Sequence, residues 1–329
     1  MLRLMLLIFF QIPVLLATGQ KITGVNFVAE KTNVDSNAFE DLKAINPKWM
    51  SWSPYAFCDI NTGNVNFNHK WQWEGESLKG TTKAIKLAKE SGLKVMIKPH
   101  VWMSDNSYTG TIKLSDSSWV NWKSTYKKYI MSFAELAQKQ EVDMFCIGTE
   151  QYASIKQNTK YWFRLIDEIK KVYKGKLIYA GNWDSYRFCP FWSKLDYIGV
   201  DAYFPLSTRS NPSVKQIKRE WSLWKKQLAD ITSRYNKQIV FTECGYKASE
   251  YTTVKPWEHD SKKKHCEQCQ ANAIDAMFQS IWGSPWFAGG FIWKWFEHGK
   301  SSKQSSKNSF CFQGKIAEKL ISREFEKLN

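Results

Sequence analysis

Residues 144–150 read Met-Phe-Cys-Ile-Gly-Thr-Glu, a run of apolar and small side chains that ends in a carboxylate. Residues 239–243 read Ile-Val-Phe-Thr-Glu and repeat this arrangement later in the chain. Uninterrupted apolar runs of this length are typical of strands that are buried on both faces, as in a parallel sheet. A carboxylate directly after such a run is costly unless it has a partner or a function. The two runs therefore predict two buried parallel strands and mark Glu150 and Glu243 as candidate functional residues.

Six more runs of this kind alternate with stretches of helical period along the rest of the chain. The runs cover residues 22–28, 49–57, 94–102, 176–183, 197–204 and 287–296, which brings the predicted strands to eight. The helical stretches cover residues 77–91, 119–140, 161–173, 214–235, 267–282 and 315–328. Eight strands that alternate with helices are the arrangement of a (β/α)8 barrel, also called a TIM barrel. No linker or low-complexity break divides the chain, so we predict a single α/β domain over residues 20–329.

The first 19 residues have the pattern of a signal peptide. Arg3 supplies a positive charge, an apolar stretch over residues 4–16 is interrupted by Gln11, and small residues at 17–19 offer a cleavage site before Gln20. A membrane anchor is the alternative, but the apolar stretch is short for a bilayer span. We therefore expect a secreted or periplasmic protein without a stable membrane anchor.

The chain is basic and rich in tryptophan. It carries a formal net charge of +16 and 17 Trp residues. Binding to nucleic acid requires a basic patch, whereas the lysines here are spread along the chain. Trp side chains either fill the core or present flat faces to flat ligands such as sugar rings. The composition therefore argues against a nucleic-acid partner and is compatible with a carbohydrate.

The seven cysteines leave at least one thiol unpaired. Cys146 and Cys244 lie within apolar runs, where cysteine serves as a small core residue. Cys266 and Cys269 have the spacing of a metal or redox pair, but no second pair at zinc spacing accompanies them. We expect a local disulfide or free thiols at these two positions rather than a zinc site.

The active sites of (β/α)8 barrels lie at the carboxyl ends of the strands, so the residues that end each predicted strand are candidate ligands. Carboxylates suit a scissile glycosidic bond, amides suit sugar hydroxyls, and indoles suit the face of the ring. Metal-dependent chemistry would require several His and Asp at strand ends, whereas only one of the five His ends a strand, so we expect no metal and no cofactor. Besides the two glutamates, the strand-end candidates are Lys98, His100, Asn182, Trp183, Tyr203, Trp293 and Trp295.

Seven short motifs in strand order resemble those of glycoside hydrolase family 113, the β-mannanases, which belong to a large clan of retaining glycosidases on this barrel. The resemblance extends from about residue 22 to residue 297. Each motif alone is common, and it is their shared order and strand positions that carry the resemblance. They are Gly-Val-Asn-Phe at 24–27, Lys-Pro-His at 98–100, Ile-Gly-Thr-Glu at 147–150, Gly-Asn-Trp at 181–183, Asp-Ala-Tyr-Phe-Pro at 201–205, Thr-Glu-Cys-Gly-Tyr at 242–246 and Phe-Ile-Trp-Lys-Trp at 291–295.

The resemblance implies that Glu150 is the general acid and base and that Glu243 is the nucleophile of a double displacement. A retaining enzyme of this kind requires two carboxyl groups about 5–5.5 Å apart. Tyr203 is placed to donate a hydrogen bond to Glu243 and to hold it ionised. Many members of the clan have Asn immediately before the acid, where it binds the sugar 2-hydroxyl. This chain has Thr149 there, so Asn182 is our candidate for that contact.

The other strand-end residues receive roles by position. We expect Trp295 to form the floor beneath the sugar ring, with Trp293 as the alternative because it has the same strand parity. Asp201 is expected to pair with Lys98 across the barrel. Candidates for hydroxyl or stacking contacts, with structural packing as the alternative for each, are His100, Lys98 and Trp183.

These observations predict a β-1,4-mannanase that hydrolyses mannan or mannooligosaccharides. A β-glucanase or another β-glycosidase keeps the same mechanism and changes the sugar, because loops around the site select the substrate and the fold alone does not name it. A carbohydrate-binding barrel without catalysis is a further alternative, although a protein that only binds has no chemical need of both glutamates.

Overall fold

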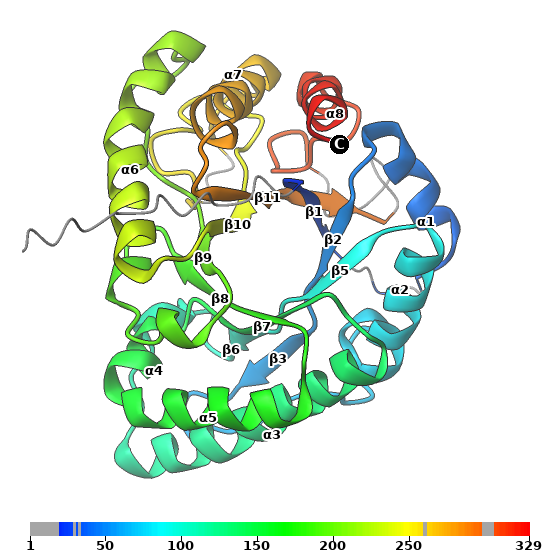
Figure 1. Cartoon of the computed structure of the whole chain (residues 1–329), viewed down its shortest axis with the longest axis vertical. Helices are drawn as coiled ribbons and strands as arrows, with labels where there is room; N and C mark the ends of the chain where they lie inside the picture. The colour runs from blue at the N-terminus through cyan, green and yellow to red at the C-terminus, as the bar shows by residue number, and fades with distance from the viewer. Residues whose placement is uncertain (1–19, 29–30, 32–33, 259–261, 298–305) are drawn as a thin grey trace, which may run out of the picture.

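The eight predicted strands close into a parallel barrel, which confirms the predicted (β/α)8 fold. In the computed structural model, which describes residues 20–28, 31, 34–258, 262–297 and 306–329, the order of strands is β1-β11-β10-β9-β8-β7-β5-β2. Every neighbouring pair is parallel, and helices surround the barrel (Figure 1). The strand bounds are Ile22–Val28 (β1), Trp49–Trp52 (β2), Lys94–Ile97 (β5), Met144–Thr149 (β7), Lys176–Asn182 (β8), Ile198–Asp201 (β9), Ile239–Cys244 (β10) and Phe287–Phe296 (β11).

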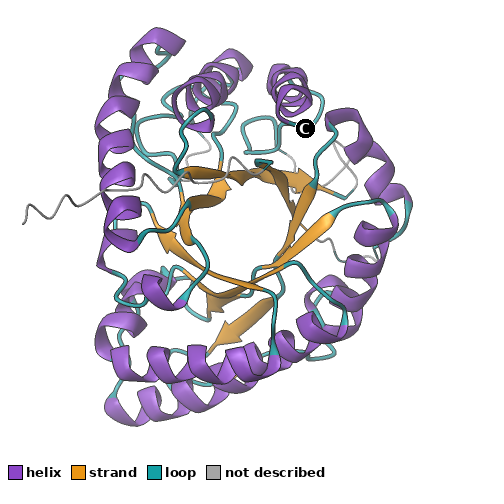
Figure 2. Cartoon of the chain, viewed as in Figure 1, coloured by secondary structure: helices purple, strands orange, loops and turns teal. Residues whose placement is uncertain are grey.

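Helices form the outer layer of the barrel, as Figure 2 shows. Ser77, Ser115 and Ser213 precede α2, α3 and α6, and each side-chain oxygen accepts a hydrogen bond from a first-turn N–H that the helix itself cannot satisfy. Between β8 and β9 the chain forms only 3-10 turns at Tyr186–Phe188 and Trp192–Lys194. The α-helices are Asn37–Glu40 (α1), Leu78–Glu90 (α2), Asp116–Lys139 (α3), Tyr152–Gln157 (α4), Thr159–Val172 (α5), Val214–Tyr235 (α6), Glu267–Met277 (α7) and Ile316–Leu328 (α8).

Two of the predicted strands are each interrupted by a proline. The run at 49–57 forms β2 and then β3 (Tyr55–Cys58) after Pro54, and the run at 94–102 forms β5 and then β6 (His100–Met103) after Pro99. Proline has no backbone N–H to give to the hydrogen-bond ladder of a central strand. The second halves leave the barrel and join β4 (Val65–Asn66) in a small sheet of order β4-β3-β6. This sheet therefore lies beyond the carboxyl ends of β2 and β5.

Apolar side chains fill the inside of the barrel. One buried cluster draws its members from six of the barrel strands and includes Met96, Met144 and Phe291. A second and larger cluster packs between the strands and the helices. Because the interior is filled, a ligand can reach the barrel strands only at their ends. Six fully buried indoles also show that many of the tryptophans serve the core, namely Trp52, Trp122, Trp162, Trp192, Trp221 and Trp295.

The two ends of the described domain lie side by side. The Gln20 amide donates to the Asn329 backbone oxygen at 3.2 Å, and the Thr23 hydroxyl donates to the Asn329 side-chain oxygen at 2.6 Å. The predicted signal peptide over residues 1–19 lies outside the described residues, so export stays a prediction. Within the described part of the chain, no helix is both long enough and apolar enough to cross a membrane.

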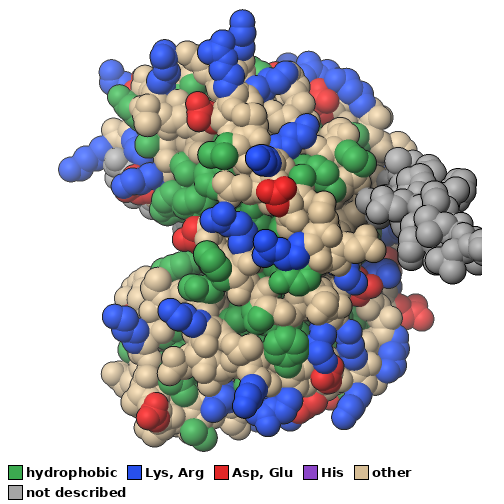
Figure 3. All heavy atoms as spheres, turned by 60° about the vertical axis from the view of Figure 1, so that its left-hand side comes forward, with side chains coloured by type: hydrophobic (Ala, Val, Ile, Leu, Met, Phe, Trp, Pro, Cys, Tyr) green, Lys and Arg blue, Asp and Glu red, His purple; other side chains and the backbone are tan. Residues whose placement is uncertain are grey.

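The lysines are distributed over the outer helices, as their spread along the sequence predicts. On the face that Figure 3 shows, Lys and Arg side chains are interspersed with other residues rather than gathered in one patch. Several of them pair with acids of a neighbouring element, including Lys127 with Glu168.

Cys266 and Cys269 form a disulfide at the start of α7. Of the two expectations for this pair, a local disulfide or free thiols, the structure has the disulfide. The remaining cysteines are buried free thiols, at positions 58, 146, 189, 244 and 311. Cys146 and Cys244 are therefore small core residues, as predicted.

Candidate active site

A cavity of about 590 Å³ opens at the carboxyl ends of the barrel strands. Its volume lies in the range of small-ligand sites, about 300–1,000 Å³. The residues predicted from strand ends reach it from five adjacent strands, β7 to β11, because the ends of parallel strands meet at one rim. Those that line it are Glu150, Asn182, Trp183, Tyr203, Glu243 and Trp293.

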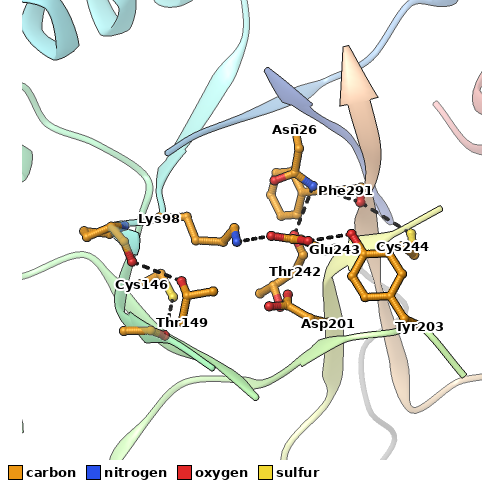
Figure 4. Close-up of polar contacts among 12 residues, drawn as sticks. Asn26, Lys98, Cys146, Thr149, Asp201, Tyr203, Thr242, Glu243, Cys244 and Phe291 are labelled. Atoms are coloured by element: carbon orange, nitrogen blue, oxygen red, sulfur yellow. Dashed lines mark hydrogen bonds and ion pairs between the residues drawn. The ribbon is translucent and has the colours of Figure 1, made fainter. Parts of the chain in front are cut away.

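Glu243, on β10, lies between a lysine and a tyrosine. Its Oε2 accepts a hydrogen bond from the Tyr203 hydroxyl at 2.5 Å, which confirms the predicted contact. Its Oε1 forms an ion pair with the Nζ of Lys98. Figure 4 shows the two partners approaching the carboxylate from opposite sides. An ammonium and a hydroxyl donor are the partners that a buried carboxylate anion requires.

Asp201 is not the ion-pair partner of Lys98, which corrects the sequence expectation. Asp201 and Glu243 are register neighbours on β9 and β10, so strand position alone does not decide which of them the lysine reaches. The Asp201 carboxylate instead accepts a hydrogen bond from the Thr242 hydroxyl at 2.7 Å. Burial and the charge of Glu243 raise the pKa of Asp201 to about 7, against the opposing effects of Lys98 and of the Thr242 hydrogen bond.

Glu150 follows β7 directly and has a left-handed backbone conformation, with φ at 54°. This conformation costs a residue other than glycine about 1–3 kcal/mol, and it persists where the surrounding structure holds it. Here the Glu150 N–H donates to the carbonyl of Ala180 on β8 at 2.8 Å. Burial raises the pKa of the Glu150 carboxyl well above its ordinary value, and the charges of Asp201 and Glu243 raise it further. Glu150 is therefore suited to carry a proton.

The two tryptophans near the end of β11 have different surroundings. Trp293 lines the cavity, whereas Trp295 is 1% exposed and packs against Phe312. Val25 of β1 pairs with Ile292 of β11, and Phe27 pairs with Trp295. Between these two pairs β1 advances by two residues, whereas β11 advances by three. This shift in register interrupts the regular alternation of side chains along the strand. The placement of Trp295 beneath the sugar is therefore corrected, and Trp293 is the candidate platform.

The comparison with known families agrees with this arrangement. The model of glycoside hydrolase family 113 matches residues 27–315. The chain belongs to glycoside hydrolase family 113. This match confirms the predicted family and the predicted enzyme class. A separate comparison with curated proteins found no match to the sequence.

Solved structures of family 113 share the fold over almost the entire chain. The β-mannanase AaManA from Alicyclobacillus acidocaldarius, solved in complex with ManMIm, is 22% identical with a TM-score of 0.82, and the match covers 96% of this chain and 100% of that one. A complex of a family 113 β-1,4-mannanase is also 22% identical, with a TM-score of 0.81 and coverage of 94% and 99%. A β-glucuronidase from Faecalibacterium prausnitzii is 10% identical, with a TM-score of 0.64 and coverage of 94% and 49%.

Two of the predicted ligands, Lys98 and His100, are absent from the lining of the catalytic cavity. Lys98 is fully buried and reaches Glu243 instead of the cavity. His100 stacks on Tyr55 with ring centroids 5.3 Å apart. Burial and the charge of Lys98 together lower the pKa of His100 to about 4, so the imidazole is neutral near pH 7. Of the two alternatives for these residues, direct sugar contact or structural packing, their contacts favour packing.

Asn182 lines the catalytic cavity, whereas Thr149 is fully buried and does not line it. The Asn182 Nδ2 donates to Asp184 at 3.1 Å, and its Oδ1 accepts from the Trp183 N–H at 3.0 Å. The hydroxyl of the fully buried Thr149 donates to the Pro99 carbonyl at 3.0 Å. Thr149 thus ties β7 to the segment between β5 and β6, and Asn182 stays the candidate for the sugar 2-hydroxyl.

Loops supply wall residues that the strand ends did not reveal. Trp257 stacks on Trp183 with ring centroids 4.9 Å apart, and Phe310 meets Tyr203 edge-on at 5.7 Å. Both come from loops that follow β10 and β11, and Tyr108 comes from the loop after β6. Their only sequence signal is an aromatic residue within a polar segment, because strand register does not determine the course of a loop.

Proposed function

We propose that this family 113 glycoside hydrolase cleaves β-1,4-linked mannan with retention of configuration, with Glu150 as general acid and base and Glu243 as nucleophile. The main support for the proposal is that the two carboxyl groups of this cavity, Glu150 and Glu243, have different surroundings. Glu243 has an ammonium and a hydroxyl partner, whereas burial and like charges raise the pKa of Glu150. Surroundings that separate the protonation states of two carboxyls are what a retaining glycosidase requires.

In the first step the glycosyl unit rests against Trp293, and the Glu243 carboxylate attacks its anomeric carbon. Glu150 gives its proton to the glycosidic oxygen as the carbon–oxygen bond breaks, so the leaving sugar departs as a neutral alcohol. Glu243 becomes a neutral ester, and the negative charge now lies on Glu150, which has lost its proton. Tyr203 and Lys98 hold the two carboxylate oxygens, which fixes the orientation of the attacking group.

In the second step a water molecule replaces the departed sugar. Glu150, now an anion, accepts a proton from this water, and the oxygen attacks the anomeric carbon and displaces Glu243. Each displacement inverts the anomeric centre, so two of them retain its configuration. The same burial and like charges that raise the pKa of Glu150 favour its return to the protonated form.

Tyr203→Phe should lower kcat on mannotetraose by about 10- to 100-fold. A hydrogen bond to a charged group contributes about 1.5–3 kcal/mol, and each 1.4 kcal/mol corresponds to about tenfold in rate. The phenylalanine ring keeps the edge-on packing against Phe310, so the thermal unfolding midpoint should change little. A wild-type kcat in this variant would show that the phenol serves packing alone.

The choice of mannan is supported by the family and by its solved structures, which are described as β-mannanases. The protein should release reducing ends from linear β-1,4-mannan at least about tenfold faster than from cellulose or xylan, a typical discrimination between related substrates. Glu150→Gln serves as the control for background release. The reverse order of rates would favour the alternative of another β-linked glycan. Binding to mannooligosaccharides without any hydrolysis would favour the non-catalytic alternative.

A further inference from the structure

A further cavity, of about 360 Å³, opens at the opposite end of the barrel, where the strands begin. Residues at the start of β1, β2, β5, β9, β10 and β11, or just before it, line this cavity. These six strands are consecutive round the barrel. No residue that lines the catalytic cavity also lines this one. We call it the amino-end cavity, and its volume lies in the range of small-ligand sites, about 300–1,000 Å³.

The floor of the amino-end cavity is aromatic. Trp49, at the start of β2, and Tyr197, just before β9, line the cavity and pack against the apolar cluster inside the barrel. Trp49 meets Phe291 of that cluster edge-on, with ring centroids 6.3 Å apart. The filled interior of the barrel therefore separates the amino-end cavity from the catalytic cavity. A ligand bound at one end of the barrel does not contact the groups at the other.

Three lysines line the amino-end cavity, and none of its described lining residues is Asp or Glu. Lys21 precedes β1, Lys48 precedes β2 and Lys94 begins β5. Within the described part of the chain, none of the three forms an ion pair with a carboxylate. Lys176, at the start of β8, differs from them because it pairs with Asp196 at 3.0 Å. The cavity thus concentrates positive charge, which attracts anions.

Lys21 is held at the wall of the cavity by neutral groups. Its Nζ donates to the backbone carbonyl oxygens of Ser284 and Phe287. An ammonium group has three N–H donors, so one donor of Lys21 stays available to a ligand. Burial lowers the pKa of Lys21, because a charged group loses hydration there without gaining a counter-charge. An anion in the cavity would supply that counter-charge.

The other two lysines also keep donors for a ligand. The Lys48 Nζ donates to the Asn46 side-chain oxygen at 3.1 Å. The Lys94 Nζ lies over the Trp49 ring, 5.5 Å from its centroid. Both partners are neutral, so neither removes the positive charge from the cavity. The three ammonium groups come from three neighbouring strands, and they can therefore approach one anion from different sides.

The type of cation favours one class of anion. The planar fork of arginine matches a flat carboxylate with two parallel hydrogen bonds, whereas the ammonium of lysine acts as a point charge and commonly binds phosphate. The amino-end cavity is lined by three lysines and, among the described residues, by no arginine. Its aromatic floor suits a ring in the organic part of the ligand. These features together favour a phosphate ester of a cyclic compound over a carboxylate.

We propose that the amino-end cavity binds a phosphate monoester. In this proposal the phosphate group contacts Lys21, Lys48 and Lys94, and the organic part lies on Trp49 and Tyr197. The site is separate from the catalytic cavity, so its occupant should not compete with the substrate. Binding should instead stabilise the fold, because a ligand that binds only the folded protein shifts the unfolding equilibrium toward that state.

Phenyl phosphate is the probe, since it combines a phosphate dianion with one ring. Isothermal titration calorimetry of the protein at low salt and about pH 8 should show one site with a Kd of about 0.1–1 mM, as expected for a few contacts with partly exposed charges. Phthalate, an aromatic dianion with flat carboxylates, should bind about tenfold more weakly, and so should inorganic phosphate, which lacks the ring. At ten times its Kd, phenyl phosphate should raise the thermal unfolding midpoint by about 2 °C.

Lys48→Gln and Lys94→Gln should each weaken the binding of phenyl phosphate by about twofold to fivefold, the range for exposed ion pairs, and the double variant by about tenfold. Lys83→Gln, at an exposed position on the outer helix α2, makes the same change in net charge and is the matched control. Lys21→Gln should also weaken binding, whereas Lys21→Arg, which keeps the charge, should retain most of it. This pair of variants separates the charge of Lys21 from its structural contacts.

Turnover of mannotetraose at saturating phenyl phosphate completes the test and should be unchanged. Inhibition by the probe would place it in the catalytic cavity and would overturn the proposal. The absence of binding would overturn it as well, as would equal affinity of the double variant and of Lys83→Gln. Phthalate that binds as tightly as phenyl phosphate would refute the choice of phosphate, and equally tight inorganic phosphate would refute the role of the aromatic floor.

Discussion

Replacement of Glu243 with alanine should lower kcat on mannotetraose by about 10⁴-fold or more, the scale on which removal of a covalent nucleophile is felt in other hydrolases. Without the carboxylate no glycosyl ester can form. The remaining groups, Glu150 and Trp293, can still bind the sugar and supply a proton, so KM should change far less than kcat. Turnover by the wild-type and variant enzymes is compared at saturating substrate.

Azide should restore part of the activity of Glu243→Ala and should invert the product. The alanine leaves a space beside the ammonium of Lys98, which in the native protein forms an ion pair with the missing carboxylate. A small anion in that space is attracted to the buried lysine and can attack the anomeric carbon once, which gives an α-glycosyl azide. Proton NMR of the anomeric signal identifies this product. Glu243→Gln, which fills the space, is the matched control and should not be rescued.

Loss of activity in Glu243→Ala must be distinguished from loss of folding. Removing one member of a buried ion pair costs about 3–5 kcal/mol, and here it leaves Lys98 with the electrostatic influence of Asp201 and Cys146. The thermal unfolding midpoint should therefore fall. Rescue by azide would show that the inactive protein is folded, whereas a variant with undiminished activity would remove Glu243 from the mechanism.

The sequence located the two glutamates because their positions follow from short-range rules. A buried parallel strand has a continuous run of apolar residues in the sequence. The first carboxylate after that run must therefore lie at the carboxyl-end rim of the barrel. The same rule could not choose the partner of Lys98, because Asp201 and Glu243 are register neighbours at that rim. Which of the two carboxylates pairs with Lys98 depends on where side-chain atoms lie across the barrel, and the local sequence does not determine these positions.

Two other misassignments have equally specific causes. A register shift in β11 interrupts the alternation that would make Trp293 and Trp295 equivalent, and such a shift leaves no clear mark in an apolar run. Pro54 and Pro99 mark breaks in two of the predicted strands, and the small outer sheet that follows them carries Tyr55 and Trp102 to a second cavity beside Trp293. The consequence of the prolines became visible only with the tertiary structure.

Glu150→Gln should lower kcat/KM for mannooligosaccharides by about 10²–10⁴-fold, the usual contribution of general acid catalysis. A sugar alcohol is a poor leaving group and needs the proton, whereas dinitrophenolate departs without one. The first step with a dinitrophenyl β-mannoside should therefore be almost unaffected. The second step also needs Glu150, as a base, so the glycosyl-enzyme should accumulate and give a burst of dinitrophenol. A slow release without a burst would contradict the assignment of Glu150 to both steps.

The pH dependence of kcat/KM should identify the group that carries the proton. Burial raises the pKa of Glu150, so the acid is present below that pKa and is lost as the pH rises through it. The wild-type enzyme should therefore lose activity on mannooligosaccharides at alkaline pH, and Glu150→Gln, which cannot titrate, should lack this alkaline limb. Asp201 is a second candidate for the limb because its pKa is raised to about 7. Asp201→Asn separates the two, since the limb should persist in that variant if Glu150 supplies the proton and vanish if Asp201 does.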